Sequence, residues 1–416
     1  MPRLLLLVPN TSYRAEEFGT AARRLGIEVS VASERASSLA GQRPADLLAL
    51  DFARPEVAVR QARRFHSRYP VDAVLGVDDA TVEAAAHVAA ALGLPHNPPE
   101  AVARARSKLR TREALREAGT PVPWFRCYSR GAQPDGFAEE VPYPCVLKPL
   151  GLSGGQGVIR ADDPRELAAA FERVGRILDR AAPQGAEAGS ILIESFIPGR
   201  EVALDGLLTA GELQVLCLWD KPDPLDGPYF EETIYVTPSR LPEAATAEIV
   251  SRVREAARVL GLREGPVHAE LRVNDEGAWL LELNPRSIGG KCSRALRFGA
   301  GLSLEELILR HALRMEIPSL ERERAAAGVM MLPIPRAGVL EEVRGEDEAL
   351  AVFGIRELIL SAHPGQELVP LPEGSAYLGF LFARGASPTA VETALREAHS
   401  RLEVVVRPVA EAGQPR

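Results

Sequence analysis

Lysine is almost missing from this chain. Only four of its 49 basic residues are lysines, and the rest are arginines. A position that keeps lysine against such a bias is one where a compact ammonium on a flexible stem is favoured over a planar guanidinium. Chance retention is the alternative for any single position. The candidate functional lysines are Lys108, Lys148, Lys221 and Lys291.

Cysteine pairs, long apolar runs and excess positive charge are lacking as well. The four cysteines form no CxxC pair, which favours buried thiols in a reducing compartment. The amino-terminal apolar run is too short for a signal peptide, and no stretch approaches the ~20 apolar residues of a transmembrane helix. The net charge of −8 offers no basic surface for nucleic acid. We therefore expect a soluble, cytoplasmic protein without nucleic-acid or membrane partners.

An alternating strand–helix pattern occupies the first 100 residues. Apolar strands are expected at residues 3–8, 28–33 and 72–77, with helices between and after them. This order predicts an open, doubly wound parallel sheet, whose ligands lie beyond the carboxyl ends of the strands, for example near Asp79. Helix capping is the alternative role of Asp79. No G-x-G-x-x-G follows the first strand, which argues against a dinucleotide site there.

The remainder of the chain divides by composition. Short alternating strands with one helix, between about residues 191 and 284, predict an α+β core. Further strands in the tail predict a smaller carboxyl-terminal α+β domain; they are expected near residues 328–333, 356–361, 376–383 and 402–407.

A lysine followed by glycines is the first motif that carries chemistry. The stretch CVLKPLGLSGGQGV predicts a strand, a glycine-rich loop and a second strand. The lysine precedes the glycines and no helix follows directly, so this is not a Walker A loop. Backbone N–H groups in such a loop can approach phosphates without Cβ obstruction, and Lys148 would reach the same phosphates. A plain hairpin is the alternative for this motif alone.

The second motif is the stretch VHAELRVNDEGAWLLELNPR. Two alternating strands flank NDEG, and a three-residue loop centred on Glu276 would place Glu270 directly opposite Glu282, with Asn284 on the same face. Opposed carboxylates repel unless a cation lies between them, and two carboxylates with an amide oxygen suit Mg²⁺. Arg286 adds a permanent positive charge nearby. A solvated hairpin is the alternative, but both acids lie within apolar runs.

The third motif is the stretch ILIESFIPGREVALDG. Glu194 ends a buried strand, an apolar link with Phe196 and Ile197 follows, and Glu201 lies beyond a Pro-Gly turn. A link whose backbone is free can hold the edge of an adenine, and an acid seven residues further on can take ribose hydroxyls. Alone, this motif would suit any strand–turn–strand.

Together and in this order, the three motifs resemble the ATP-grasp superfamily of ligases over most of the chain. The stretches GPYFEETIYVTPS, GPVHAELRVNDEGAWLLELNPRSIGG and GSAYLGFLFARG are most similar to carboxylate–amine ligases that join amino acids, the L-amino acid ligase group. The resemblance implies an α/β ATP-grasp fold with an α+β core. It implies an N-terminal doubly wound domain (1–100), an ATP-grasp core (101–318) with a lid subdomain at about 125–195, and a C-terminal domain (319–416).

The resemblance also implies an activity and a set of roles. An ADP-forming ligase of this kind uses ATP and Mg²⁺ (or Mn²⁺) to convert a carboxylate into an acyl-phosphate, which an amine then attacks. Arg286 and Lys148 would be the catalytic residues, and Arg286 would stabilise the acyl-phosphate. The metal ligands would be Glu270, Glu282 and Asn284. The ATP site would consist of Lys108, Lys148, Ser153, Gly154, Gly155, Gly157, Glu194, Phe196, Ile197 and Glu201. In it, Glu194 and Ile197 would hold the adenine and Glu201 the ribose.

The substrate side is less defined. Glu231 or Glu232 is a candidate for holding an α-amino group, and His268 is either a substrate contact or a neutral core residue. Gly289 and Gly290 would leave space for the activated acid, next to Arg286. The expected partners are small molecules, an amino acid or similar carboxylate and an amine, and homodimers are frequent among proteins resembling this one.

Two alternatives stay open at this level. One keeps the ATP-grasp core with other substrates, as in biotin carboxylases or purine-pathway ligases. The other is a module that senses ATP without turning it over. The intact set Glu270, Glu282, Asn284 and Arg286 argues against a sensor, because a sensor does not need metal ligands together with a catalytic arginine.

Overall fold

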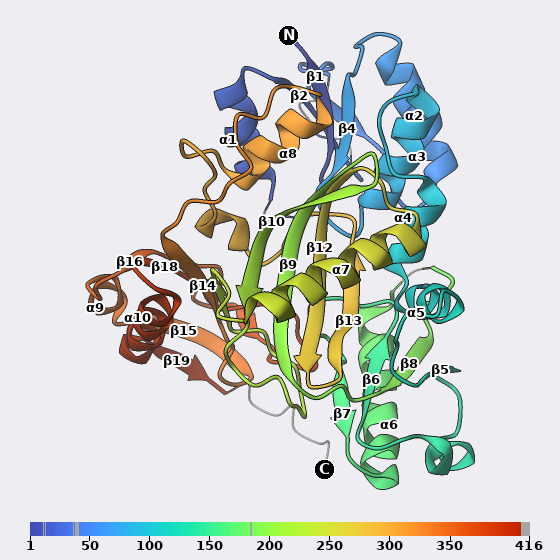
Figure 1. The fold of residues 1–416 in the computed structure, drawn as a ribbon, viewed down its shortest axis with the longest axis vertical. Coiled ribbons are helices and arrows are strands. Elements are labelled where there is room, and N and C mark those ends of the chain that lie inside the picture. Colours follow the sequence, from blue (N-terminus) through green and yellow to red (C-terminus); the bar gives the residue numbers. More distant parts are fainter. Residues whose placement is uncertain (11, 13, 36, 38–40, 184, 409–416) are drawn as a thin grey trace, which may run out of the picture.

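The N-terminal part of the molecule is a four-stranded parallel sheet (Figure 1, blue) with strand order β3-β2-β1-β4. The computed structural model describes residues 1–408 except 11, 13, 36, 38–40 and 184. The elements of this part are β1 (Arg3–Leu7), α1 (Ala15–Leu25), β2 (Glu28–Ser33), β3 (Leu47–Ala49), α2 (Pro55–His66), β4 (Ala73–Gly76) and α3 (Val82–Leu92).

Both faces of this sheet are buried, as a doubly wound sheet requires. Leu4 and Leu6 pack with α1 and with α8 (Leu304–Ala312), which arrives from the middle of the chain. Leu5 and Leu7 point to the other face and pack with α2 and α3. The predicted doubly wound sheet is confirmed, and β3 is a strand that the sequence analysis did not expect.

A second four-stranded sheet, of antiparallel strands in the order β5-β8-β6-β7, lies in the segment predicted to be a lid and is called the lid below (Figure 1, green). The helix α6 packs on it, and the two share an apolar core of their own. The elements here are α4 (Pro99–Arg106), α5 (Lys108–Glu117), β5 (Phe125–Ser129), η1 (Pro134–Gly136), η2 (Ala138–Glu140), β6 (Cys145–Pro149), β7 (Ile159–Ala161), α6 (Pro164–Ala181) and β8 (Ser190–Ser195).

The largest sheet has eight strands in the order β13-β12-β9-β10-β11-β14-β18-β16. Its last three strands come from the tail of the chain, so the tail extends the central sheet (Figure 1). The strands of this sheet that precede the tail are β9 (Arg200–Thr209), β10 (Glu212–Asp220), β11 (Ile234–Thr237), β12 (Gly265–Asn274) and β13 (Gly277–Asn284). The helices α7 (Glu243–Leu260) and η3 (Cys292–Ala295) belong to the same part of the chain.

The tail also contains a small three-stranded sheet of order β17-β15-β19. Two of its strands, β15 and β17, were not expected from the sequence. The tail elements are β14 (Ala326–Leu332), β15 (Gly338–Arg344), α9 (Glu346–Leu350), β16 (Ile355–Leu360), β17 (Glu367–Leu368), β18 (Gly379–Gly385), α10 (Pro388–Arg401) and β19 (Glu403–Arg407). Over the described residues, no helix has both the length and the apolar character needed to cross a membrane.

Candidate active site

The β12–β13 hairpin places Glu270 directly opposite Glu282, as the sequence predicted. The predicted loop is wrong, however. Asn274 pairs with Gly277, so the loop has two residues, and this register alone would set Glu270 opposite Leu281. A β-bulge between Glu270 and Leu271 leaves Leu281 as an extra residue and restores the expected pair. The carbonyl of Leu281 accepts a hydrogen bond from Arg112 Nη2 at 2.9 Å.

Helix α5 delivers two cations to this region. Ser107 caps the helix by accepting from Arg110 N, and this start places Lys108 and Arg112 four residues apart on one face. Lys108 Nζ lies 2.8 Å from Glu282 Oε2, and Asn284 Nδ2 donates to Glu282 Oε1 at 2.8 Å. Burial alone would raise the pKa of Glu282, but the charge of Lys108 lowers it well below its ordinary range. Glu282 is therefore ionised and has a neighbour on each carboxylate oxygen.

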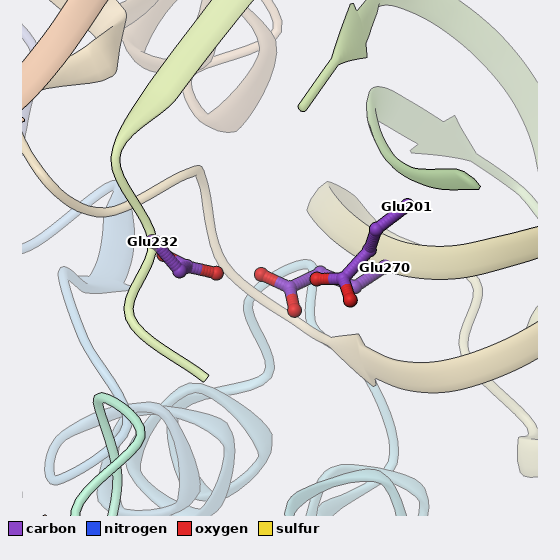
Figure 2. Close-up of side chains that lie close together, drawn as sticks. All are labelled: Glu201, Glu232 and Glu270. Atoms are coloured by element: carbon purple, nitrogen blue, oxygen red, sulfur yellow. The ribbon is translucent and has the colours of Figure 1, made fainter. Parts of the chain in front are cut away.

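Two further carboxylates, Glu201 and Glu232, converge on Glu270 of the hairpin. One carboxylate oxygen from each of Glu201, Glu232 and Glu270 lies within 4.8 Å of the others, and Figure 2 shows the three side chains pointing towards one another. Lys221 Nζ is 2.7 Å from Glu201 Oε1, 2.7 Å from Glu232 Oε1 and 3.3 Å from Glu270 Oε1. Burial would lower the pKa of Lys221, but these carboxylates raise it well above its ordinary value. The carboxylates therefore favour a cation at this point.

His268 is buried next to this cluster and bridges two acids. Its Nδ1 is 3.3 Å from Asp205 Oδ1, and its Nε2 is 3.3 Å from Glu270 Oε1. Asp205 also accepts from Trp219 Nε1 at 2.8 Å and from Ile288 N at 3.2 Å. Burial alone would lower the pKa of His268, but Asp205 and Glu270 raise it to about 9. The raised pKa favours the imidazolium over the neutral ring at neutral pH, and the side chain is buried as a core residue would be.

Lys148 and Glu194 form one buried group with Arg112. Lys148 Nζ is 2.5 Å from Glu194 Oε2, and Arg112 Nε is 2.5 Å from Glu194 Oε1. Burial would raise the pKa of Glu194, but Arg112 and Lys148 lower it to about 2. Lys148 belongs to β6, the strand that leads into the glycine-rich loop. Both oxygens of Glu194 face cations, whereas the sequence analysis assigned this residue to adenine.

The apolar link after Glu194 is less free than the sequence suggested. The Phe196 N–H donates to Pro144 O at 2.8 Å, and the Ile197 carbonyl accepts from Arg272 Nη1 at 3.0 Å. The Arg272 guanidinium also lies 4.9 Å from the centre of the Phe196 ring and 3.2 Å from Glu201 Oε2. Two of the backbone groups of the link are therefore engaged, one by Pro144 and the other by Arg272 of β12.

The glycine-rich loop connects β6 with β7, and its glycines are required by the backbone. Gly154, Gly155 and Gly157 have φ values of 62°, 73° and 72°. A Cβ on Gly157 would lie 2.9 Å from Pro149 Cγ, so the turn folds back on the end of β6. Ser153 begins this turn, since its carbonyl accepts from Gln156 N at 3.3 Å.

Arg286 joins the hairpin to the N-terminal domain. Its Nε and Nη2 donate to Asp79 Oδ1 and Oδ2 at 2.8 and 2.7 Å. Arg14 makes a parallel link, because its Nη1 donates to the carbonyls of Val77 at 2.7 Å and Ser287 at 3.1 Å. The carboxyl end of β4 therefore meets the segment that follows β13. Burial would raise the pKa of Asp79, but Arg286 lowers it.

Gly290, the second of the paired glycines, lies against β14 of the eight-stranded sheet. Gly290 has a φ of 57°, and a Cβ on it would be 2.7 Å from Met331 Sδ in β14. Gly289 begins the turn that leads into η3, since its carbonyl accepts from Cys292 N at 3.0 Å. Both glycines therefore lie just beyond Arg286, between the hairpin and the tail.

The structure thus gathers most of the predicted residues but regroups some of them. Glu201 and Glu232, expected at the ribose and at an amino group, join Glu270 around Lys221. Lys221 and Arg112 were not assigned to the site. The scarcity of lysine had singled out Lys221, whereas no sequence signal distinguishes Arg112 within an arginine-rich helix.

Comparison with known protein families agrees with this geometry. A family model described as an ATP-grasp domain matches residues 141–295. Models described as an ATP-grasp N-terminal domain and as L-amino acid ligase C-terminal domain 2 match residues 19–96 and 330–407.

Individual proteins resemble the chain over different lengths. The crystal structure of an L-amino acid ligase from Bacillus licheniformis superposes with a TM-score of 0.77 and 26% identity, over 98% of this chain and 99% of that one. Carnosine synthase 1 of Gallus gallus is 32% identical over 66% of this chain, but the match spans only 31% of that protein. D-alanine–D-alanine ligase of Acidovorax ebreus is 28% identical over 60% of this chain and 75% of its own length. The chain spans about a third of the carnosine synthases that it matches.

Proposed function

Because the chain belongs to the ATP-grasp superfamily of carboxylate–amine ligases, we propose that it joins an amino acid to an amine and releases ADP and phosphate. The predicted superfamily and fold are therefore confirmed. An amino acid as the activated carboxylate is supported by the likeness to ligases whose names specify alanine or L-amino acids.

The observation that carries the proposal is the opposed pair Glu270 and Glu282, each with its own lysine. Lys108 contacts Glu282 and Lys221 contacts Glu270. Neighbouring cations lower the pKa of both carboxylates, and Arg286 is among those that act on Glu282. A protein that transfers a phosphoryl group needs this concentration of positive charge around negative ligands more than it needs a nucleophile.

The oxygen donors fit a hard divalent cation. Glu270, Glu282 and Asn284 would hold Mg²⁺ or Mn²⁺, and Glu201 and Glu232 offer further carboxylate oxygens within reach of Glu270. Such a cation, when bound with ATP, would neutralise charge on the phosphates. The chain provides the donors already deprotonated, because the pKa values of Glu270 and Glu282 are lowered by neighbouring cations.

The cationic side chains of the site would each have a role in the first step. A substrate carboxylate oxygen attacks the γ-phosphorus of ATP, the bond to ADP breaks, and an acyl-phosphate forms. Lys108 and Lys148 would bind the α- and β-phosphates, and the glycine loop would present its N–H groups to the triphosphate. Arg286, which Asp79 holds through Nε and Nη2, would stabilise the negative charge of the acyl-phosphate with its guanidinium.

In the second step the amine attacks the acyl carbon. A carbon–nitrogen bond forms, the amine loses a proton, and inorganic phosphate leaves. Arg286 would stabilise the oxyanion of the tetrahedral intermediate. Glu232 would orient the incoming or activated amino group, because its carboxylate faces the same space as Glu270.

The test is phosphate release from Mg·ATP with single and paired amino acids, followed by mass spectrometry. ADP, phosphate and a new amide mass are expected, and Glu282→Gln should abolish them while Glu276→Gln, at the exposed hairpin tip, should not. AMP and pyrophosphate would contradict acyl-phosphate chemistry. ATP binding without turnover for any pair would favour a sensor.

A homodimer, expected from the resemblance, stays a prediction. Sedimentation velocity at several protein concentrations would check it, with a single monomeric species as the contradicting result.

A further inference from the structure

The lid is a body with its own apolar core. Apart from Tyr229, the side chains of this core belong to residues 124–193. The apolar core of the tail is built from residues 234–406 and includes no lid side chain among the described residues. A unit that buries its own apolar surface, and meets its neighbour through polar contacts, can separate from it without exposing a core.

The glycine loop of the lid rests on one short stretch of the tail, residues 371–377, which we call the tail segment. Gly157 N donates to Pro372 O at 2.9 Å, and Gln156 Nε2 donates to Glu373 O at 2.6 Å. A pocket lies beside these contacts, lined from the lid by Gln156 and Arg180 and from the tail by Tyr377 and its neighbours. The two bodies therefore touch locally and do not form a continuous packed interface.

Arg173 of α6 makes the strongest of these contacts. Its Nε and Nη2 bind Glu373 Oε1 and Oε2 at 2.7 and 2.9 Å, a bidentate geometry that fixes both planes. Arg173 also donates to the hydroxyl of Tyr229, and its guanidinium lies 5.1 Å from the centre of that ring. The side chains of Arg173 and Glu373 are 35% and 28% exposed, so water can reach the pair and it can break.

The two partners of Arg173, Tyr229 and Glu373, each lie a few residues before a side chain at the carboxylate cluster. Tyr229 lies three residues before Glu232 in the same loop. Glu373 lies four residues before Tyr377, whose pKa is raised well above its ordinary value by burial and by the charge of Glu232. The lid helix therefore contacts the two segments that enclose Glu232 and Lys221.

We propose that the Arg173–Glu373 pair is a latch, which holds the glycine loop on the tail segment and must break before nucleotide can leave. The inference rests on the proposed function only in that the loop is taken to cover the triphosphate. It assigns to the tail a role in nucleotide exchange, separate from the residues that bind phosphate or metal.

A pair that serves only to stabilise the fold would behave differently. A partly exposed ion pair contributes little to global stability, and if that were its only role its loss would not change nucleotide exchange. A latch acts on the open–closed equilibrium of the lid, so its loss speeds nucleotide release and exposes the loop.

The experiment compares Glu373→Gln, Arg173→Gln and the double variant with the full-length wild type. The matched control is Glu323→Gln, which breaks the Arg384–Glu323 pair of similar length (2.7 Å) and exposure (30% and 33%) away from the lid. Release of a fluorescent Mg·ADP analogue is measured by stopped flow. Each single variant should release it about fivefold faster, the double variant no faster than either single, and the control at the wild-type rate.

A second readout needs no nucleotide. Thermolysin cleavage at Leu150 or Leu152, mapped by mass spectrometry, should be faster in both latch variants than in wild type or control. Unchanged release and unchanged cleavage in the latch variants, or multiplying effects in the double variant, would overturn the latch. Failure of the wild type to bind the analogue would instead refute the proposed function, and the cleavage comparison would still decide on the latch.

Discussion

Lys148 shares Glu194 with Arg112, so its pocket already contains one guanidinium. A second planar guanidinium at residue 148 would have to fit beside the first around a carboxylate that is 2% exposed. We expect Lys148→Arg to lower ATP turnover about 100-fold, the order of loss seen when one preorganised donor is removed. Steady-state phosphate release measures this. Arg110→Lys on the exposed face of α5 is the control, and a Lys148→Arg protein with turnover within a few-fold of wild type would contradict the prediction.

Glu194 also predicts an acid-sensitive stability. Its pKa falls from an ordinary 4.5 to about 2 in the folded protein, despite burial, because Arg112 and Lys148 favour the charged form. A lowered folded pKa gives stability that is complete above pH 4.5 and is lost as the pH falls towards 2. The full effect is about 3 kcal/mol. Urea unfolding between pH 5 and pH 3 should show a shallower pH dependence in Glu194→Gln than in wild type, and equal slopes would contradict the assignment.

The individual residues were easier to predict than their partners. Four residues stand out in the sequence. Lys148 does so because lysine is rare in this chain, and Glu194, Glu270 and Glu282 do so because each is an acid within an apolar strand. The pairing of Glu194 with Arg112 spans 82 residues and needs α5 to dock against two sheets, which local patterns do not encode. Expected contacts with adenine and ribose were therefore assigned to acids that the structure also pairs with arginine and lysine.

The hairpin shows the same limit for an element. Alternation predicted which acids face each other, but it could not distinguish a three-residue loop from a two-residue loop with a bulge, since both give the same pair. The bulge accompanies a hydrogen bond from Arg112 to the Leu281 carbonyl, a contact from outside the hairpin.

Arg112 is therefore expected to stabilise three elements at once, α5, β8 and β13. Arg112→Gln should lower the free energy of unfolding by about 3 kcal/mol, because it removes a buried ion pair and the donor to the bulge. Chemical denaturation measures the change. Arg110→Gln, two residues earlier in an exposed pair with Glu100, should change stability little. Equal losses of unfolding free energy in the two variants would contradict the prediction that the buried ion pair of Arg112 stabilises the fold more than the exposed pair of Arg110.

For the whole molecule, the doubly wound domain was predictable because its strands and helices alternate locally. The docking of this domain on the rest of the molecule was not predictable. It depends on contacts of Arg14 with Ser287 and of Asp79 with Arg286, and the partners in each contact are more than 200 residues apart in the sequence. The predicted boundary near residue 318 stays a proposal. It falls between α8 and β14, although the central sheet continues on both sides of it.

The docking predicts a selective loss of function. Asp79→Asn keeps the shape but weakens the hold on Arg286, so we expect kcat to fall about tenfold through misorientation while KM for ATP changes less than about twofold. Glu83→Gln in the same domain, which breaks the partly exposed pair of Glu83 with Arg106 of α4, is the control. A parallel rise of KM for ATP in Asp79→Asn would indicate that the domain supports nucleotide binding instead.

The pairing of β11 with β14 limits how the tail of this chain can be exchanged for the tail of another protein. β11 is paired with β10 at one residue pair but with β14 at four, so the tail holds it more firmly than the preceding strand does. The loop that carries Glu231 and Glu232 runs straight into β11. A chimera with a foreign tail must therefore reproduce the β14 register, or the loop that carries Glu231 and Glu232 loses its anchor.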